Sequence, residues 1–178
     1  MNLVIFGPPG AGKGTQSKFI AEKFNLFQLS TGEFLRKEIS NNTPIGKKIS
    51  SIINEGNLVS DQIVSDLIEK IISNKDYENR IIFDGYPRNL NQAKNLDNLL
   101  KKYKQKIDIV FKLSVSLKTV KKRILERQSQ EQRVDDNEEI AIKRYKTYEK
   151  SSEPVINYYN QSNLVKVVNG EAGISEIN

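Results

Sequence analysis

The strongest restriction on the fold of this chain comes from a glycine-rich loop close to the N-terminus. Residues 7–15 read GPPGAGKGT, and the apolar run Leu3–Phe6 precedes them. Apolar residues at helical spacing follow the loop, which predicts a strand, a loop and then a helix from about Lys13 to Lys23. The glycines let backbone N–H groups face inward, and the helix N-terminus and Lys13 add positive charge. The loop therefore predicts a binding site for the phosphates of a nucleoside triphosphate.

One position in the loop departs from the general pattern of such sites. Gly14 follows the lysine directly, where Ser or Thr usually ligates Mg²⁺, and Thr15 comes only after it. This order disfavours a direct bond between a hydroxyl and the metal, of the kind found in GTPases.

The rest of the chain alternates short apolar runs with helical patterns. Further strands are predicted at residues 27–29, 81–84, 107–113 and 164–168. Helices are predicted at residues 30–39, 44–54, 60–73, 90–103, 117–127 and 137–159. Pro154 lies inside the last helix, where proline can kink or break it. This alternation predicts a single α/β domain over residues 1–178, with a five-stranded parallel sheet flanked by helices and a ligand at the carboxyl ends of the strands.

Composition excludes several kinds of chemistry. The sequence has no Cys and no His, which rules out disulfides, Cys- or His-based zinc sites, thiol nucleophiles and Ser-His triads. The net charge is +6, but basic residues are spread along the chain among acidic ones, so we expect an anionic small substrate and no nucleic-acid partner. No apolar stretch approaches about 18 residues. The first six residues lack the charged start of a signal peptide, so we expect a cytoplasmic protein with no membrane partner.

Several ordered motifs resemble those of the adenylate kinases. Residues 7–16, GPPGAGKGTQ, look like the phosphate loop of that family, and four further motifs fit in order: residues 30–36 (STGEFLR), residues 84–88 (DGYPR), Gln92 and residues 133–136 (RVDD). The resemblance runs from residue 1 to about residue 170. It implies a three-layer P-loop NTPase fold and a monomer that catalyses ATP + AMP = 2 ADP with Mg²⁺. It also implies binding of ATP, AMP and ADP and a role in adenine nucleotide homeostasis and biosynthesis.

The resemblance assigns two sets of residues to ATP and to phosphoryl transfer. The ATP set is Gly10, Ala11, Gly12, Lys13, Gly14, Thr15, Arg127 and Ala172. The catalytic set is Lys13, Arg88, Arg123, Arg127, Arg133 and Arg144. By resemblance, Arg123 lies against the ATP adenine and Arg127 contacts ATP phosphate, while Arg133 and Arg144 bridge towards AMP. These residue types suit the reaction, because phosphoryl transfer needs positioning and charge neutralisation, and guanidinium groups hold phosphate oxygens bidentately.

Two residues decide which monophosphate is expected. In the resembling family Thr31 and Gln92 read adenine, whereas UMP/CMP kinases tend to have Ala and Asn there. A glutamine amide can pair with the adenine amino group and a ring nitrogen. Arg36 and Arg88 match the clamps of the AMP phosphate. The AMP set implied by resemblance is Thr31, Arg36, Asn57, Leu58, Val59, Gly85, Tyr86, Pro87, Arg88, Gln92, Arg133 and Arg144.

Metal binding is expected only through water. Asp84 ends a predicted buried strand, where a carboxylate needs a polar partner. It either anchors the water shell of Mg²⁺, together with Thr15, or caps the following turn. Asp135 and Asp136 either cap the long helix or, by resemblance, order the arginines of the closed site. We expect no zinc.

Two segments are expected to move on binding. Many bacterial adenylate kinases carry a long lid, sometimes with zinc-binding cysteines, but here only five residues, 128–132, separate Arg127 from Arg133. The chain therefore resembles the short-lid form, with a lid at residues 127–133 and an AMP-binding helical insertion at residues 30–59. Lid closure excludes water, which otherwise accepts the phosphoryl group.

Three other functions remain open on sequence alone. A UMP/CMP kinase is disfavoured by Thr31 and Gln92, and a regulatory GTPase-like switch by the arginine set and by Gly14. Nucleic-acid binding is suggested only by the net charge. Activity with different monophosphates, ADP formation from ATP and AMP, and salt-dependent DNA binding separate these alternatives.

Overall fold

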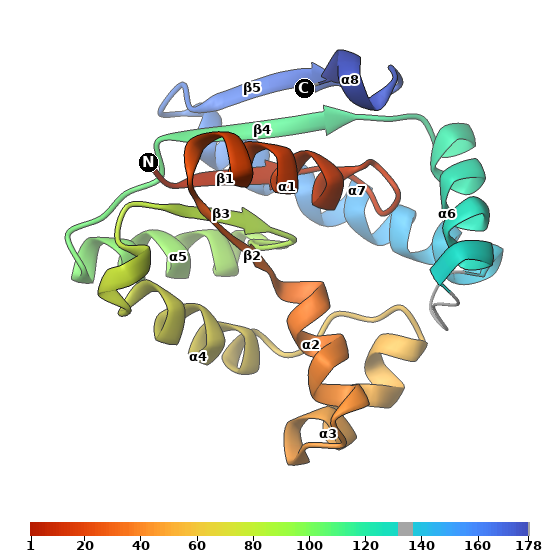
Figure 1. Ribbon diagram of the computed structural model, residues 1–178, viewed down its shortest axis with the longest axis horizontal. Helices are drawn as coiled ribbons and strands as arrows, with labels where there is room; N and C mark the ends of the chain where they lie inside the picture. The colour runs from red at the N-terminus through yellow and green to blue at the C-terminus, as the bar shows by residue number, and fades with distance from the viewer. Residues whose placement is uncertain (132–136, 178) are drawn as a thin grey trace.

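A five-stranded sheet forms the centre of the molecule (Figure 1). The computed structural model describes residues 1–131 and 137–177. The strands are β1 (Leu3–Phe6), β2 (Phe27–Ser30), β3 (Ile81–Asp84), β4 (Ile109–Ser114) and β5 (Val165–Asn169). They lie in the order β2-β3-β1-β4-β5, and every neighbouring pair is parallel. The predicted five-stranded parallel sheet is confirmed.

Helices connect the strands and begin at side chains suited to that position. They are α1 (Lys13–Phe24), α2 (Thr31–Ser40), α3 (Pro44–Asn54), α4 (Asp61–Ile72), a 3₁₀ turn at Lys75–Tyr77, α5 (Leu90–Lys102), α6 (Leu117–Glu131), α7 (Glu138–Asn160) and α8 (Ile174–Ile177). The predicted cap at Ser30 is present, since its hydroxyl accepts from the backbone N–H of Glu33. Asn89 and Asn137 cap α5 and α7 in the same way. Among the helices in the described ranges, none is long and apolar enough to cross a membrane.

Both faces of the sheet are covered, which makes three layers. In β1, Val4 and Phe6 belong to one apolar core and Leu3 and Ile5 to the other, as the two-residue period of a strand requires. The first core includes buried residues of α4, α5 and the C-terminal half of α7. The second includes residues of α1, α6 and α8. Every residue of β1 and β3 is buried, which explains why these strands read as uninterrupted apolar runs.

One expectation about the helices is wrong. The polar stretch after Arg127 was expected to leave the helix, but α6 continues through Glu131. Gln, Ser and Glu tolerate helix, and no Gly or Pro interrupts residues 128–131. The long helix predicted at residues 137–159 is confirmed as α7, and Pro154 does not break it. The helix runs on to Asn160 and buries Val155 in the core, so tertiary packing outweighs the lost hydrogen bond.

Candidate active site

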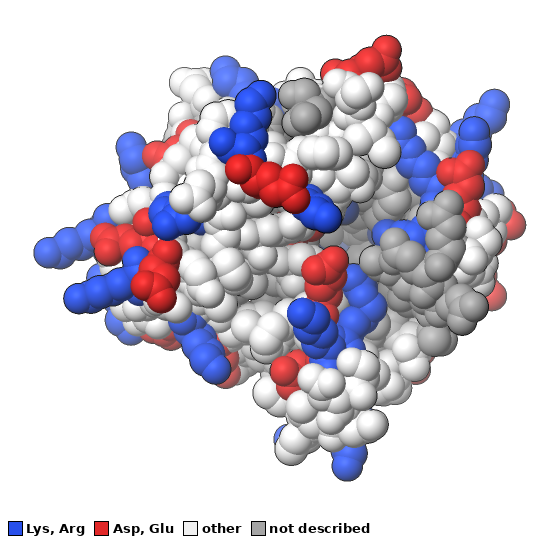
Figure 2. All heavy atoms as spheres, in the orientation of Figure 1, with Lys and Arg blue, Asp and Glu red and all other residues white. Residues whose placement is uncertain are grey.

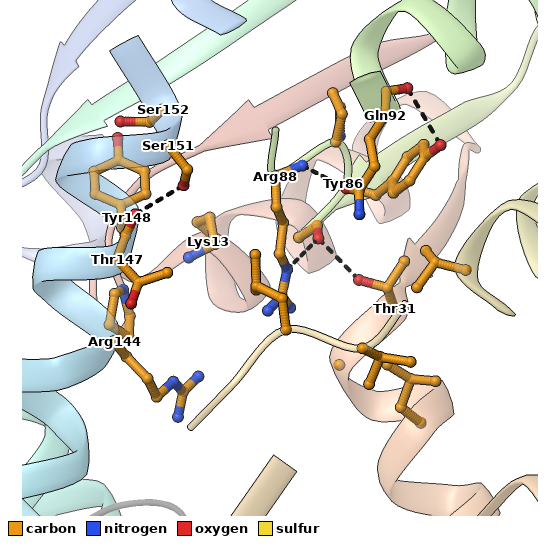
Figure 3. A pocket seen from close by; sticks show the side chains of 18 of the residues that line it. Lys13, Thr31, Tyr86, Arg88, Gln92, Arg144, Thr147, Tyr148, Ser151 and Ser152 are labelled. Carbon is orange, nitrogen blue, oxygen red and sulfur yellow. Dashed lines mark hydrogen bonds between the residues drawn. The ribbon is translucent and has the colours of Figure 1, made fainter. Parts of the chain in front are cut away.

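A cleft opens at the carboxyl ends of the central strands, where the alternation of strands and helices predicted a ligand. β1 and β3 pair with Ile5 opposite Asp84, so the loops that follow them, at Gly7 and Gly85, leave the sheet side by side. The cleft is open to solvent on one side and is lined by both polar and apolar residues, as ligand sites usually are. Twelve residues predicted for the site line it: Lys13, Thr31, Arg36, Asn57, Leu58, Val59, Gly85, Tyr86, Pro87, Arg88, Gln92 and Arg144. Several are drawn in Figure 3.

The phosphate loop has the conformation that anion binding needs. Gly12 caps α1 with a left-handed φ of 90° and no side-chain hydrogen bond, which leaves the first N–H groups of the helix without a capping side chain. The ammonium group of Lys13 folds back onto the loop and donates to the carbonyl oxygens of Gly7 and Pro8. The loop is therefore already curved around its lysine.

Positive charge converges on Lys13. Withdrawal from water, the largest cause, acts with the charges of Arg88, Arg144 and Arg127 to lower the pKa of Lys13 to about 8, while Asp84 opposes them. Side chains from the loop after β3 and from α6 and α7 thus act on one ammonium group. Figure 2 shows basic side chains around a hollow in this face of the molecule. Such a cluster stabilises a polyanion.

Asp84 is a buried carboxylate at the base of the cleft. Only 6% of Asp84 is exposed, and burial raises the pKa of its carboxyl group, while Lys13, Gln28 and Arg88 oppose that rise. The Gln28 amide donates to Asp84 at 3.3 Å and to the carbonyl oxygen of Gly14 at 3.4 Å. Gln28 was not predicted as a site residue. Its position as a polar residue between the apolar Phe27 and Leu29 of a short strand could have indicated it.

Thr31 and Arg88 meet at Gly85. The Thr31 hydroxyl donates to the Gly85 carbonyl oxygen at 3.0 Å, and Nε of Arg88 donates to the same oxygen at 2.7 Å. Gly85 has a φ of +79°, and a Cβ there would lie 3.0 Å from the Thr31 hydroxyl and 3.3 Å from the Arg88 guanidinium. Only glycine fits this position without strain. Arg36 lies close by, because a Cβ on Gly32 would be 3.4 Å from its guanidinium nitrogens.

Gln92 is buried at the other side of Arg88. Its Oε1 accepts from the Arg88 backbone N–H at 2.7 Å, and its Nε2 donates to Asp61 at 2.7 Å. The Asn89 amide also donates to Asp61. The sequence alone did not predict a role for Asp61 beyond the start of a helix.

Arg123 joins the phosphate loop to the segment after β5. Its guanidinium donates to the carbonyl oxygen of Ala11 at 3.5 Å and to that of Ala172 at 3.4 Å. Arg123 and Ala172, 49 residues apart, were both predicted on the triphosphate side, and the structure brings them together. Arg127 lies one helical turn further along α6. Arg133, with Asp135 and Asp136, lies outside the described residues.

One wall of the cleft is a face of α7. Arg144 was predicted there, but four further lining residues were not: Thr147, Tyr148, Ser151 and Ser152. Their helical spacing places them on one side of α7, and that periodicity was the available signal (Figure 3). The end of α3 reaches this helix, since Lys143 donates to the Glu55 carbonyl oxygen at 2.7 Å.

The phosphate loop, the parallel sheet and the basic cleft define a nucleotide kinase of the phosphate-loop class. The family model described as adenylate kinase matches residues 5–164. The chain is 43% identical over 176 residues to the adenylate kinase of Prochlorococcus marinus (strain MIT 9515), with 99% of this chain and 93% of the relative covered. It is 40% identical over 203 residues to that of Pelagibacter ubique (strain HTCC1062), with 99% and 95% covered. The chain belongs to the adenylate kinase family.

Proposed function

We propose that the cleft binds two nucleotides at once and that the chain transfers a phosphoryl group between them, ATP + AMP = 2 ADP. One observation carries this proposal. Lys13 of the phosphate loop and the group formed by Gly85, Arg88 and Gln92 line one continuous cleft, so a triphosphate at the first can reach a monophosphate at the second. A regulatory nucleotide switch needs no second group of residues that binds a monophosphate.

The catalytic power comes from fixed positive charge. An oxygen of the AMP phosphate forms a bond to the γ-phosphorus of ATP while the bond to the β,γ-bridging oxygen breaks, and its electron pair leaves with ADP. Lys13 and Arg127 hold the phosphates of ATP, and Arg123 lies against its adenine. Arg36 and Arg88 hold the AMP phosphate, and Arg133 and Arg144 bridge towards AMP. No side chain needs to act as a histidine-like base, because charge stabilisation dominates phosphoryl transfer.

Thr31 and Gln92 select the base of the monophosphate. Residues 57–59, Tyr86 and Pro87 line the same cleft and complete that pocket. On the triphosphate side, ATP extends from its phosphates at the phosphate loop to its base beside Arg123 and Ala172. This division gives an ATP half and an AMP half on opposite sides of Lys13.

The residues at the base of the cleft fit Mg²⁺ bound mainly by phosphate and water. Within the described ranges no group of three or more Asp, Glu, His or Cys gathers, so no dedicated protein cage exists there. Asp84 and Thr15 supply the oxygen groups that a hydrated Mg²⁺ prefers, and Asp84 is kept near the loop by Gln28. When bound, the metal neutralises phosphate charge.

Two segments close the site in this proposal. Residues 30–59, which contain α2 and α3, fold over AMP, and residues 127–133 act as a short lid. Since α6 continues through Glu131, Arg127 moves with a rigid helix rather than with a loop. The enzyme works as a cytoplasmic monomer that balances adenine nucleotides.

Purified protein tests the reaction directly. We expect ADP formation from ATP, Mg²⁺ and AMP, with much lower rates for UMP, CMP or GMP. Arg88→Met should lower kcat/KM for AMP by at least about 100-fold, whereas Lys166→Met, which removes an exposed cation from β5, should leave it unchanged. No ADP formation with AMP, or a preference for UMP or CMP, refutes the proposal.

A further inference from the structure

The side-chain amide of Gln92 is held at both of its ends. Oε1 accepts from the backbone N–H of Arg88 at 2.7 Å, and Nε2 donates to Oδ1 of Asp61 at 2.7 Å. Gln92 is only 3% exposed, so bulk water does not compete for either group. Figure 3 shows this side chain beside Tyr86 and Arg88 at the end of the cleft.

These two partners allow only one orientation of the amide. A backbone N–H can only donate, and a carboxylate can only accept. If the amide of Gln92 turned over, its NH₂ group would face the Arg88 N–H and its oxygen would face the Asp61 carboxylate. Both contacts would be repulsive, and a buried polar group would lose its partner.

A third side chain holds the arrangement together. The amide nitrogen of Asn89 donates to Asp61 at 3.1 Å, and the amide oxygen of Asn89 accepts from the Gln92 backbone N–H at 2.8 Å. Asn89 thereby links the first turn of α5 to the first residue of α4. The hydroxyl of Tyr86 donates to the Gln92 carbonyl oxygen at 3.2 Å and fixes the backbone of the same residue.

The locked amide still has one acceptor and one donor site to offer. Oε1 has two lone pairs, of which Arg88 uses one, and Nε2 has two protons, of which Asp61 takes one. An adenine presents the matching pair, an amino donor next to a ring-nitrogen acceptor. A 6-oxopurine presents a carbonyl acceptor in place of the amino group, which would face the lone pair of Oε1.

We propose that Asp61 is a positioning residue that fixes the polarity of the Gln92 amide and thereby favours AMP over 6-oxopurine monophosphates. Asp61 acts through Gln92 and need not contact the nucleotide. The inference rests on the proposed function, since it takes Gln92 to be the group that meets the AMP base.

Exposure limits the size of the effect. Asp61 is exposed, so water screens its charge and the bond to Gln92 is worth less than a buried one. The hydrogen bond from the Arg88 backbone N–H to Gln92 also remains when Asp61 is changed. We therefore expect an effect of about threefold to tenfold on base selectivity, rather than a loss of activity.

The first experiment compares Asp61→Asn with a matched control. Asp66 lies on the same helix and also accepts from a glutamine amide, that of Gln62 at 2.7 Å, but this pair is exposed and outside the main cleft. Asp61→Asn should raise KM for AMP with little change in kcat, and lower the ratio of kcat/KM for AMP over IMP by about threefold to tenfold. Asp66→Asn should change neither quantity, and Asp61→Glu, which keeps a carboxylate, should retain more of the ratio than Asp61→Asn.

The second experiment observes the amide itself in the unsubstituted protein. In ¹⁵N NMR spectra, with the signal assigned by its loss in Gln92→Leu, one side-chain amide proton of Gln92 should exchange with water much more slowly than those of Gln62. In Asp61→Asn this protection should fall. Fast exchange of both Gln92 protons in the unsubstituted protein overturns the inference, whether or not Asp61→Asn folds.

Failure of this inference can be told apart from failure of the proposed function. If the unsubstituted protein phosphorylates AMP and Asp61→Asn loses AMP and IMP activity by the same factor, Asp61 is only structural and the inference is wrong. If the unsubstituted protein does not phosphorylate AMP, the proposed function itself has failed, and the NMR measurement still reports whether Asp61 holds Gln92.

Discussion

The ammonium group of Lys13 lies 2.8 Å from the carbonyl oxygen of Gly7, six residues earlier in the phosphate loop. With the bond to Pro8, this contact keeps the lysine inside its own loop. Withdrawal from water, reinforced by nearby arginines, lowers the pKa of Lys13 to about 8. The lysine therefore titrates close to neutral pH, and a bound triphosphate, which favours the charged form, would raise its pKa again.

ATP binding should consequently draw a proton from the solvent at pH 8. At this pH about half of the empty protein carries an unprotonated Lys13, whereas the complex carries the ammonium form. Well below pH 8 the lysine is protonated in both the empty protein and the complex, so ATP binding takes up no proton there. The affinity for ATP should weaken as the pH rises through about 8. Calorimetry in two buffers with different ionisation heats measures the uptake, and Lys13→Met should abolish the part due to the lysine. Equal uptake by both proteins contradicts this prediction.

Asp84→Asn should separate catalysis from stability. Burial raises the pKa of the Asp84 carboxyl group, so the charged form is less favourable in the folded protein than in the unfolded chain. Asparagine keeps the shape and can still accept from Gln28, so we expect an unchanged or higher Tm. The rate of transfer with Mg²⁺ should fall by about 100-fold, because the carboxylate is lost beside the phosphates.

The opposite outcome for Asp84→Asn would support a turn-capping role for Asp84. In that case Tm falls while kcat per folded molecule stays the same. The wild-type rate should also fall on acidification at a higher pH than an ordinary Asp would give, because the pKa is raised. Measuring kcat between about pH 4 and about pH 8 checks this point.

Most of the fold could be predicted because its signals are local. The run Leu3–Phe6, the glycine loop and the helical spacing after Lys13 each specify one element without reference to distant residues. The same holds for the site residues carried by ordered motifs, such as Thr31 and Gln92, and the structure places both in the cleft.

The partners of those residues could not be predicted in the same way. Asp61 meets Gln92 across 31 residues and Gln28 meets Asp84 across 56, so only the packing of the sheet and helices brings each pair together. The continuation of α6 past Arg127 was misjudged because polar residues between two arginines of a motif suggested a loop, although their helix propensity is adequate.

Gly46→Ala should weaken the packing of α3 on α2. A Cβ at Gly46 would lie 2.0 Å from the carbonyl oxygen of Glu38, a backbone atom that cannot rotate away. We expect a loss of about 2–4 kcal/mol in the free energy of unfolding, or a displaced α3 with a higher KM for AMP. Urea unfolding and AMP kinetics measure the two effects. Gly173→Ala is the control, because its Cβ would meet only the flexible end of Glu176, at 3.4 Å. Similar values for the two variants would show the prediction to be wrong.

Asn2→Leu should destabilise the fold without affecting the chemistry. Asn2 is fully buried, its Oδ1 accepts from the Ile81 N–H at 3.0 Å, and its Nδ2 donates to Gln105 and to the Lys106 carbonyl oxygen, both at 3.1 Å. Leucine fills the space but leaves these groups unpaired, which should cost about 2–4 kcal/mol of unfolding free energy. Asn2 lies at the amino end of β1, whereas the phosphate loop follows the carboxyl end of that strand. We therefore expect kcat below the unfolding temperature to stay within about twofold of the wild type. Leucine at the exposed Asn160 is the control, and an equal, small loss of stability in both variants would mean that water replaces the missing partner.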